Sequence, residues 1–192
     1  MSVAAVVLAA GAGTRFTASG GTGHKLLADL GGRTVLDRVL ETVVATHLPV
    51  AVVSGATDLR DRVPSEVTLL ANDRWAEGIA TSVQVAVRWA EAEGHHALVV
   101  GLADQPAVTT ATWATLAALP SDPSGPPIAV ATYDGRRGNP VRLAAAVWPL
   151  LPDSGDEGAR SLLRERPELV REVPCSGHAW DVDTVEDLER WS

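Results

Sequence analysis

The sequence has very little lysine. Of its sixteen Lys and Arg residues in a chain of 192, all but Lys25 are arginine. Such avoidance of lysine predicts a specific use for the one that is kept. A compact ammonium on a flexible stem suits a phosphate group, whereas the planar guanidinium of arginine suits a bidentate partner. Lys25 is therefore the first candidate functional residue.

Cysteine, basic clusters and long apolar runs are also scarce. Cys175 is the only cysteine, so no disulfide can form within the chain, which is typical of a reducing cytoplasm. No apolar run has the length of a membrane helix, and the short apolar start lacks the basic residues of a signal peptide. The formal net charge is -8 without a basic tail, which argues against nucleic acid as a partner. We expect a cytoplasmic protein with neither nucleic acid nor membrane as a partner.

What the sequence contains is an alternation of apolar runs and helical patterns. Hydrophobic residues make up 46% of the chain, enough for the core of one domain over residues 1–192. The order of these patterns predicts an α/β fold, a three-layer Rossmann-like arrangement around a mostly parallel sheet. In the first part we expect strands at 3–9, 50–53, 67–71 and 97–102, and helices at 34–47, 79–92 and 109–119.

The pattern changes after a linker at 120–127 that is rich in Pro, Ser and Gly. Beyond it the apolar runs are shorter, which predicts a small C-terminal α+β region. We expect strands there at 128–132, 140–143 and 169–173, and helices near 144–150, 157–165 and 185–191.

Polar and glycine residues follow several of the predicted strands. In open α/β sheets, ligands bind in the crevice at the carboxyl ends of the strands. We therefore expect one crevice to be lined by the residues that follow these strands, namely 10–13, 54–55, 72–73 and 104–106.

The stretch Leu8–Arg15 reads Leu-Ala-Ala-Gly-Ala-Gly-Thr-Arg. Its glycines allow the backbone to approach phosphate oxygens closely, and successive amides form an anion-binding nest. A dinucleotide fingerprint would need glycine in place of Phe16, and a P-loop would need Gly before Lys25 and Ser or Thr after it. The remaining pattern is Leu-Ala-Ala-Gly-x-Gly-Thr-Arg followed by Lys-Leu-Leu.

That pattern resembles the nucleotidyltransferases of the nucleotide-diphospho-sugar transferase-like fold, above all the molybdenum-cofactor cytidylyltransferases and their guanylyl relatives. The resemblance extends from Val6 to Leu188 and implies that Arg15 and Lys25 bind the triphosphate. Such relatives usually carry the lysine closer to the arginine. We interpret the intervening Gly/Ser/Thr-rich segment, Thr17–Gly23, as a flexible lid over the phosphates.

Two acidic motifs indicate a metal site. A carboxylate at the end of a buried strand is costly unless it binds a cation, and Mg²⁺ is commonly held by one or two carboxylates plus substrate phosphates. The resemblance implies Asp104, in Asp-Gln-Pro, and Asp183, in Asp-Val-Asp-Thr, as the ligands. Asp181 lies on the same side of the chain as Asp183, and its role, structural or catalytic, stays open. Thr184 and Asp187 predict a capping box for the last helix.

Three further segments resemble the family. The stretch 72–82 is similar to Asn-x-x-Trp-x-x-Gly-x-x-x-Ser, and the stretches 137–141 and 155–160 resemble segments that face the acceptor. Arg160 either holds the acceptor phosphate or lies on a helix surface. The nucleotide-binding residues implied are Leu8, Ala9, Ala10, Gly11, Ala12, Gly13, Thr14, Arg15, Lys25, Ser54, Asn72, Gly78 and Ser82. The acceptor-binding residues implied are Gln105, Pro106, Gly138, Asn139, Pro140, Gly155, Asp156, Gly158 and Arg160.

The resemblance implies a Mg²⁺-dependent nucleotidyltransferase with a nucleotide-binding half at 1–119 and an acceptor-binding half at 128–192. Arg15, Lys25, Asp104 and Asp183 are its implied catalytic residues. The nucleotide would be CTP, because guanylyl relatives tend to carry glycine at the place of Ala10, with GTP as the other choice. The acceptor would be molybdopterin, and a molybdenum hydroxylase would be a partner. Two alternatives remain, namely another phosphorylated acceptor such as a sugar phosphate, and a non-catalytic carrier of the molybdenum cofactor.

Overall fold

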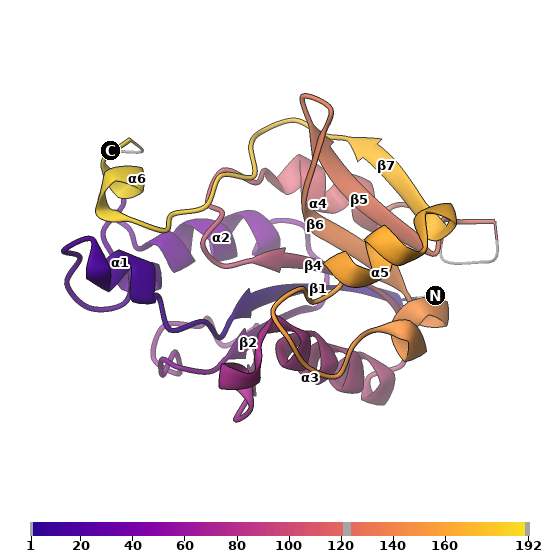
Figure 1. The fold of residues 1–192 in the computed structure, drawn as a ribbon, viewed down its shortest axis with the longest axis horizontal. Coiled ribbons are helices and arrows are strands. Elements are labelled where there is room, and N and C mark those ends of the chain that lie inside the picture. Colours follow the sequence, from indigo (N-terminus) through magenta and orange to yellow (C-terminus); the bar gives the residue numbers. More distant parts are fainter. Residues whose placement is uncertain (1, 121–123, 191–192) are drawn as a thin grey trace.

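The computed structural model describes residues 2–120 and 124–190. Their strands form one sheet in the order β3-β2-β1-β4-β6-β5-β7, with helices on both faces (Figure 1). All of these strands run in the same direction except β6, which is antiparallel to β4 and β5. The strands are β1 Ser2–Ala9, β2 Val50–Ser54, β3 Thr68–Ala71, β4 His95–Leu102, β5 Ile128–Tyr133, β6 Arg136–Ala144 and β7 Val170–Pro174. The predicted α/β fold with a mostly parallel sheet is confirmed.

The helices divide between the two faces of the sheet. The cluster that contains α2 and α4 covers one face, and the cluster that contains α3, η3 and α5 covers the other. The helices are α1 Thr14–Ala18, α2 Val35–Val44, α3 Ile79–Ala92, α4 Thr110–Ala117, α5 Arg160–Glu165 and α6 Val185–Arg190. Short 3-10 turns are η1 Lys25–Leu27, η2 Trp75–Glu77, η3 Ala145–Leu150 and η4 Pro167–Leu169. None of the helices in the described part of the chain is long and apolar enough to cross a membrane.

Strand β1 shows why the apolar runs of the sequence become central strands. Its side chains alternate between the two cores: Val7 packs with α2 and α4, whereas Val6 packs with α3. A strand that is buried on both faces has no place for polar residues, which explains the continuous apolar run. β1 pairs in parallel with β2 on one side and β4 on the other, so the three carboxyl ends meet at one edge.

Reciprocal capping pairs fix the starts of two helices, and the pair at α6 is the one that the sequence predicts. At α2 the Thr34 hydroxyl accepts from the Asp37 amide at 3.1 Å, and the Asp37 carboxylate accepts from the Thr34 amide at 3.0 Å. At α6 Thr184 and Asp187 form the same reciprocal pair, at 3.2 and 2.9 Å. Each pair satisfies two amides that the first helical turn leaves without an intrahelical partner.

The second part of the chain departs from prediction at several boundaries. The expected strand at 140–143 is the end of the longer strand β6, which pairs with β5 on one side and β4 on the other. The expected helix at 144–150 is the 3-10 turn η3, which contains Pro149, and the helix expected from 157 begins at Arg160. Residues 121–123 of the linker and the end of the helix expected at 185–191 lie outside the described residues.

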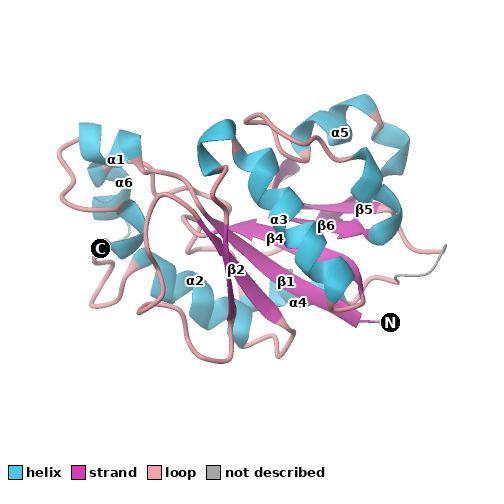
Figure 2. Cartoon of the chain, turned by 90° about the horizontal axis from the view of Figure 1, so that it is seen from below, coloured by secondary structure: helices cyan, strands magenta, loops and turns pink. Residues whose placement is uncertain are grey.

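The segment after β7 returns to the edge of the sheet where β1 and β4 end. Its backbone is tied there, because the Val182 amide donates to the Asp104 carbonyl at 2.8 Å. Helix α6 follows beside α1 (Figure 2), and the Val185 amide donates to the Ser19 hydroxyl at 3.0 Å. These contacts bring the last acidic motif of the sequence to the glycine-rich loop after β1.

Candidate active site

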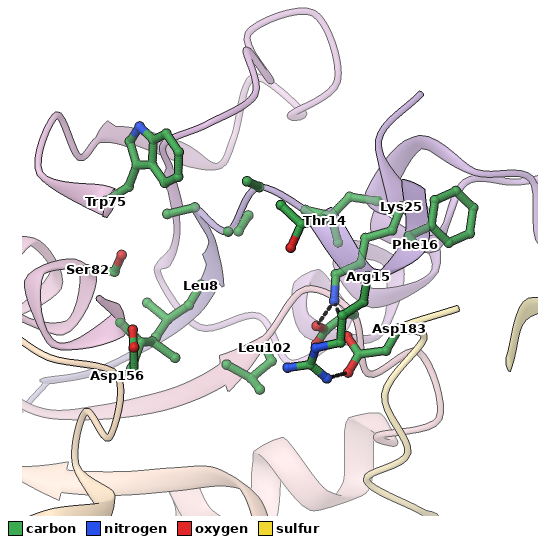
Figure 3. Close-up of a pocket in the computed structure, with 18 of the residues that line it drawn as sticks. Leu8, Thr14, Arg15, Phe16, Lys25, Trp75, Ser82, Leu102, Asp156 and Asp183 are labelled. Atoms are coloured by element: carbon green, nitrogen blue, oxygen red, sulfur yellow. Dashed lines mark hydrogen bonds and ion pairs between the residues drawn. The ribbon is translucent and has the colours of Figure 1, made fainter. Parts of the chain in front are cut away.

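A cavity of about 390 Å³ opens at the carboxyl ends of β1 and β4 (Figure 3). We call it the main cavity. The whole predicted phosphate loop lines it, together with Lys25, Asp104 and Asp183. The loop residues on its lining are Leu8, Ala9, Ala10, Gly11, Ala12, Gly13, Thr14 and Arg15. The strand-end rule therefore located the cavity correctly for β1 and β4.

The loop depends on glycine where it turns into α1. Gly13 has φ 65°, in the left-handed region that other L-residues rarely adopt. A Cβ there would lie 3.4 Å from both the His24 ring and the Lys25 side chain, so the φ angle rather than space calls for glycine. The His24 Nε2 atom in turn hydrogen-bonds to the Gly11 carbonyl at 2.8 Å. Together these contacts hold the loop against the turn that carries Lys25.

Four charged side chains from three distant parts of the sequence form one ion-pair network. Lys25 Nζ donates to Asp104 Oδ2 at 2.5 Å and to Asp183 Oδ1 at 2.7 Å. Arg15 donates to the other carboxylate oxygen of Asp183, as Figure 3 shows. The structure thus brings together the four residues that the sequence singled out as catalytic.

Burial makes the lysine part of this network strong and the arginine part weak. The side chain of Lys25 is 12% exposed, whereas that of Arg15 is 77% exposed. Desolvation lowers the pKa of Lys25, but the charges and hydrogen bonds of Asp104 and Asp183 outweigh it and raise the pKa above its ordinary value. Lys25 is therefore cationic at neutral pH. An exposed pair such as that of Arg15 contributes at most about 1 kcal/mol.

The two aspartates are suited to a divalent cation. They share one ammonium, so their oxygens converge, and Asp104 Oδ1 is buried without a hydrogen-bond partner. Within residues 2–120 and 124–190, no three His, Cys, Asp or Glu side chains cluster as a complete metal site. Two carboxylates alone fit a Mg²⁺ ion that takes its other oxygen ligands from a substrate.

The segment Thr17–Gly23, which the sequence suggested as a flexible lid, does not cover the main cavity in this structure. Thr17 already belongs to α1, and the segment folds back on Phe16, whose ring would clash at 2.2 Å with a Cβ on Gly21. None of its residues lines the main cavity. The segment instead adjoins α6 through Ser19. Its extra length is taken up in a largely exposed turn, and Lys25 still reaches both aspartates.

Two predicted nucleotide-binding residues lie behind the cavity. Ser54 and Asn72 are buried and absent from its lining. The Ser54 hydroxyl donates to the Leu70 carbonyl at 3.2 Å, between β2 and β3. Asn72 Nδ2 donates to the hydroxyls of Thr81 and Ser82, both at 2.9 Å. Asn72 is thus placed to orient Ser82, which does line the cavity.

Gly78 lines the main cavity, and the loop that contains Gly155 packs closely against it. Gly78 has φ 107°, and a Cβ there would lie 2.3 Å from the carbonyl carbon of Gly155. The Gly155 amide donates to the Glu77 carbonyl at 2.8 Å, and the Gly155 carbonyl accepts from Ala80 at 3.0 Å. This contact carries Asp156, which was predicted to bind the acceptor, onto the lining of the main cavity beside the phosphate loop.

A second cavity, of about 600 Å³, collects several predicted acceptor residues. We call it the outer cavity; Gln105, Gly138, Asn139 and Arg160 line it. Gly158 lines a smaller cavity of about 90 Å³ together with Asp156. Three predicted acceptor residues line none of these cavities, namely Pro106, Pro140 and Gly155.

Sequence reasoning missed several residues of the outer cavity. Its lining also includes Tyr133, Arg136, His178 and Trp180. No spacing in the sequence marks them, because they come from a hairpin and from the irregular segment after β7. The sequence signal that existed was compositional, since tryptophan is abundant while Tyr and Phe occur once each.

The chain is similar to known proteins in sequence and in fold. Nicotine blue oxidoreductase from Paenarthrobacter nicotinovorans is 33% identical over 203 residues, covering 98% of this chain and 95% of the relative. The structure of Rv0371c from Mycobacterium tuberculosis is 25% identical with a TM-score of 0.80, covering 99% of this chain and 97% of that one. Rv0371c has also been solved in complex with manganese, at 26% identity and a TM-score of 0.73, covering 100% and 98%.

The same fold occurs in a nucleotidyl transferase from Methanothermobacter thermautotrophicus, with a TM-score of 0.80, 23% identity and coverage of 98% and 95%. The family model of the MobA-like NTP transferase domain matches residues 5–171. That match takes in the phosphate loop, Lys25 and Asp104, and Asp183 follows it. This chain belongs to the MobA-like NTP transferase family and is a nucleotidyltransferase.

Proposed function

We propose that this protein transfers a nucleoside monophosphate from CTP to the phosphate of molybdopterin, with Mg²⁺ as cofactor and release of pyrophosphate. The observation that carries the proposal is the network in which Lys25 lies between Asp104 and Asp183 at the mouth of the glycine-rich loop. Such a group of charges serves phosphoryl-type transfer, in which catalysis is mostly positioning and charge neutralisation.

The charged residues of the site have two roles, in binding the metal and in binding the phosphates. Asp104 and Asp183 would hold Mg²⁺, which supplies charge neutralisation at the phosphates. Lys25 and Arg15 exchange their carboxylate partners for phosphate oxygens and stabilise the pyrophosphate as it leaves. The amides of the loop at 11–14 hold the triphosphate, and Ser82 and Asp156 border the space beyond it. The acceptor phosphate attacks the α-phosphorus from the side of the outer cavity.

The choice of nucleotide and acceptor rests on the family and on one loop residue. Ala10 lines the main cavity at the place where guanylyl relatives tend to carry glycine, which favours CTP over GTP. Membership of the MobA-like family favours a molybdenum-cofactor acceptor. A molybdenum hydroxylase as recipient and a cytoplasmic location, predicted from the single cysteine, belong to the same proposal.

The test is pyrophosphate release by the purified protein with molybdopterin and each of the four NTPs, with and without Mg²⁺. We expect release with CTP and Mg²⁺, and the product molybdopterin cytosine dinucleotide by mass spectrometry. Release with glucose 1-phosphate but not with molybdopterin supports a sugar-phosphate acceptor instead. Absence of release, with tight binding of molybdopterin cytosine dinucleotide, supports the carrier alternative.

A second candidate function comes from the relative that matches almost the whole chain, which is named an oxidoreductase. A nicotinamide dinucleotide would be the usual electron donor, but the loop has Phe16 where the dinucleotide fingerprint needs its third glycine. Phe16 is 2% exposed, and its ring lies against Gly21. Oxidation of NADH or NADPH by the protein in the presence of nicotine blue, without pyrophosphate chemistry, would favour this candidate.

A further inference from the structure

One histidine side chain joins the phosphate loop to the turn that carries Lys25. His24 Nε2 lies 2.8 Å from the carbonyl oxygen of Gly11, a residue 13 positions earlier in the chain. The other ring nitrogen, Nδ1, lies 3.3 Å from the backbone amide of Leu26. His24 is not on the lining of the main cavity, so any effect it has on a bound triphosphate passes through the residues that it contacts.

These two contacts define the tautomer of the ring. A backbone amide can only donate, so Nδ1 of His24 accepts the Leu26 N–H and carries no hydrogen. The hydrogen of the neutral imidazole therefore lies on Nε2, which donates it to the Gly11 carbonyl. The ring thus satisfies one backbone donor and one backbone acceptor, and both of its nitrogens are held.

The segment between the phosphate loop and Lys25 needs such a fixed point. Residues 17–23 are largely exposed and include three glycines, which leaves the backbone much conformational freedom. Lys25 is also held by the two aspartates of the metal site, but in the proposed function it exchanges them for phosphate oxygens. The contact between His24 and Gly11 involves neither carboxylate. It can therefore hold the Lys25 turn against the loop before and after that exchange.

The same hydrogen bond determines how the loop presents its next amide. The peptide bond between Gly11 and Ala12 is trans, so its C=O and N–H groups point in opposite directions. The carbonyl is turned toward His24, outside the cavity lining, whereas Gly11 and Ala12 both belong to the lining. Across residues 2–120 and 124–190, the Ala12 amide has no acceptor. That amide is therefore available to donate to an anion in the main cavity.

We propose that His24 is a positioning residue for nucleotidyl transfer. By holding the Gly11 carbonyl, its ring aims the Ala12 amide at the triphosphate and keeps Lys25 beside the same phosphates. The inference rests on the proposed function, in which this loop binds the triphosphate, and adds a residue that touches neither substrate nor metal. The role depends on the donor at Nε2 and not merely on the capping of the turn by Nδ1.

Two substitutions of His24 separate positioning from support of the local fold. Asn is a good N-cap and can still accept the Leu26 amide, but its side chain is too short to reach the Gly11 carbonyl. Gln is one methylene longer, and its amide nitrogen can replace Nε2 as the donor. His96→Gln changes an exposed histidine away from the main cavity and serves as the control.

The first test is binding of the magnesium complex of inorganic tripolyphosphate, measured by isothermal titration calorimetry. We expect His24→Asn to bind it roughly 10-fold more weakly than the wild type, as for loss of one well-placed hydrogen bond to a charged group. His24→Gln should stay within about threefold of the wild type, because it keeps the donor. His96→Gln should bind like the wild type. Equal affinities of wild type and His24→Asn, an equal loss in both His24 variants, or no binding by the wild type overturns the inference.

NMR of the wild type tests the geometry without any substitution. We expect proton–nitrogen correlation spectra of the His24 ring to show the hydrogen on Nε2 at neutral pH. The amide resonance of Ala12 should move when the tripolyphosphate complex is added, because that amide donates to a phosphate oxygen. A ring with its hydrogen on Nδ1, or an Ala12 resonance that does not respond, overturns the inference.

Steady-state pyrophosphate release with CTP and molybdopterin separates this inference from the proposed function. We expect His24→Asn to lower kcat/KM for CTP roughly 10-fold and to leave the KM for molybdopterin unchanged, because the contact lies on the triphosphate side of the site. Donor-dependent tripolyphosphate binding without pyrophosphate release under any condition supports the inference while the proposed function fails. Pyrophosphate release with the same kcat/KM for CTP in wild type and His24→Asn overturns the inference while the proposed function stands.

Discussion

At the scale of single residues, the most telling position is Lys25. A chain that otherwise uses arginine for its positive charges has one lysine, and that lysine contacts both candidate metal ligands. A single ammonium can donate to two converging carboxylates and later to phosphate oxygens, because its three donors rotate about one flexible stem. The side chain of Lys25 is only 12% exposed. The larger, planar guanidinium of arginine could not change from carboxylate to phosphate partners in so confined a place.

Lys25 is expected to stabilise charge in the transition state rather than to bind substrate alone. Lys25→Ala should lower kcat by roughly 10²–10³, as for loss of one preorganised donor. Lys25→Arg should recover less than about a tenth of the lost rate, because its shape differs. The measurement is steady-state pyrophosphate release at saturating CTP. Full activity of Lys25→Arg would contradict this role, since it would show that any cation suffices.

Residue patterns in the sequence predicted the charged network but not its surroundings. Asp104 and Asp183 could be identified because each stands in a motif that resembles one of the family's. Ser54 and Asn72 follow strands and were expected to bind the nucleotide, yet their side chains bond to a neighbouring strand and a neighbouring helix. The sequence shows that a residue follows a strand, but it does not show which way its side chain points.

At the scale of elements, helices and strands with a regular apolar pattern could be predicted from the sequence, whereas irregular segments could not. Helix α3 has the predicted bounds of 79–92, because an amphipathic repeat and the glycine before it fix both its face and its start. The length of strand β6 was misjudged, since pairing with β4 and β5 decides it, and η3 is a 3-10 turn that contains Pro149. Pairing partners that are distant in sequence leave no local signal.

Arg142 is a buried charged residue of strand β6 that binds the segment before β5. It is 0% exposed on β6, and its guanidinium donates to the carbonyls of Pro126 at 3.2 Å and Pro120 at 3.0 Å. We expect Arg142→Met to lower the free energy of unfolding by about 2–4 kcal/mol, because buried carbonyls lose their donors. Urea denaturation measures this change. Arg171→Met, on the exposed surface of β7, should stay within about 0.5 kcal/mol of the wild type. Equal effects of the two substitutions would contradict the structural role of Arg142.

His95 makes the pairing of β4 with β1 sensitive to pH. It starts β4, and its Nδ1 lies 2.8 Å from the Ser2 hydroxyl, with Trp89 of α3 beside the ring. Burial lowers the pKa of His95, partly offset by the charge of Glu93 and assisted by that of His96. As pH falls, His95 therefore binds a proton more readily in the unfolded chain than in the folded protein. The contribution of His95 to stability is present above about pH 6.5 and is lost as pH falls through the folded-state pKa.

Thermal unfolding of wild type and His95→Gln across about pH 8 to pH 5 measures this effect. As pH falls, the wild type should lose stability relative to His95→Gln. His96→Gln, an exposed neighbour, serves as the matched control and should follow the wild-type profile more closely. Parallel profiles of wild type and His95→Gln would show that the imidazole is not desolvated.

At the scale of the whole molecule, the parallel sheet brings the site together. β1 and β4 end side by side, so the loop after β1 and Asp104 after β4 meet, and the segment after β7 returns to the same edge with Asp183. The general rule for open α/β sheets predicted where the main cavity lies. The outer cavity could not be predicted in this way, because it is built from a hairpin and an irregular segment whose path no periodic pattern defines.

The proposed metal site is tested by the metal dependence of pyrophosphate release in variants of its two aspartates. We expect Asp104→Asn and Asp183→Asn each to lower Mg²⁺-dependent turnover by at least about 10²-fold, at unchanged secondary structure by circular dichroism. Asp153→Asn, an exposed carboxylate outside the main and outer cavities, should retain wild-type rates. If either Asp104→Asn or Asp183→Asn turns over CTP at near the wild-type rate with the same Mg²⁺ requirement, the carboxylate pair is not the metal site and the proposed mechanism is wrong.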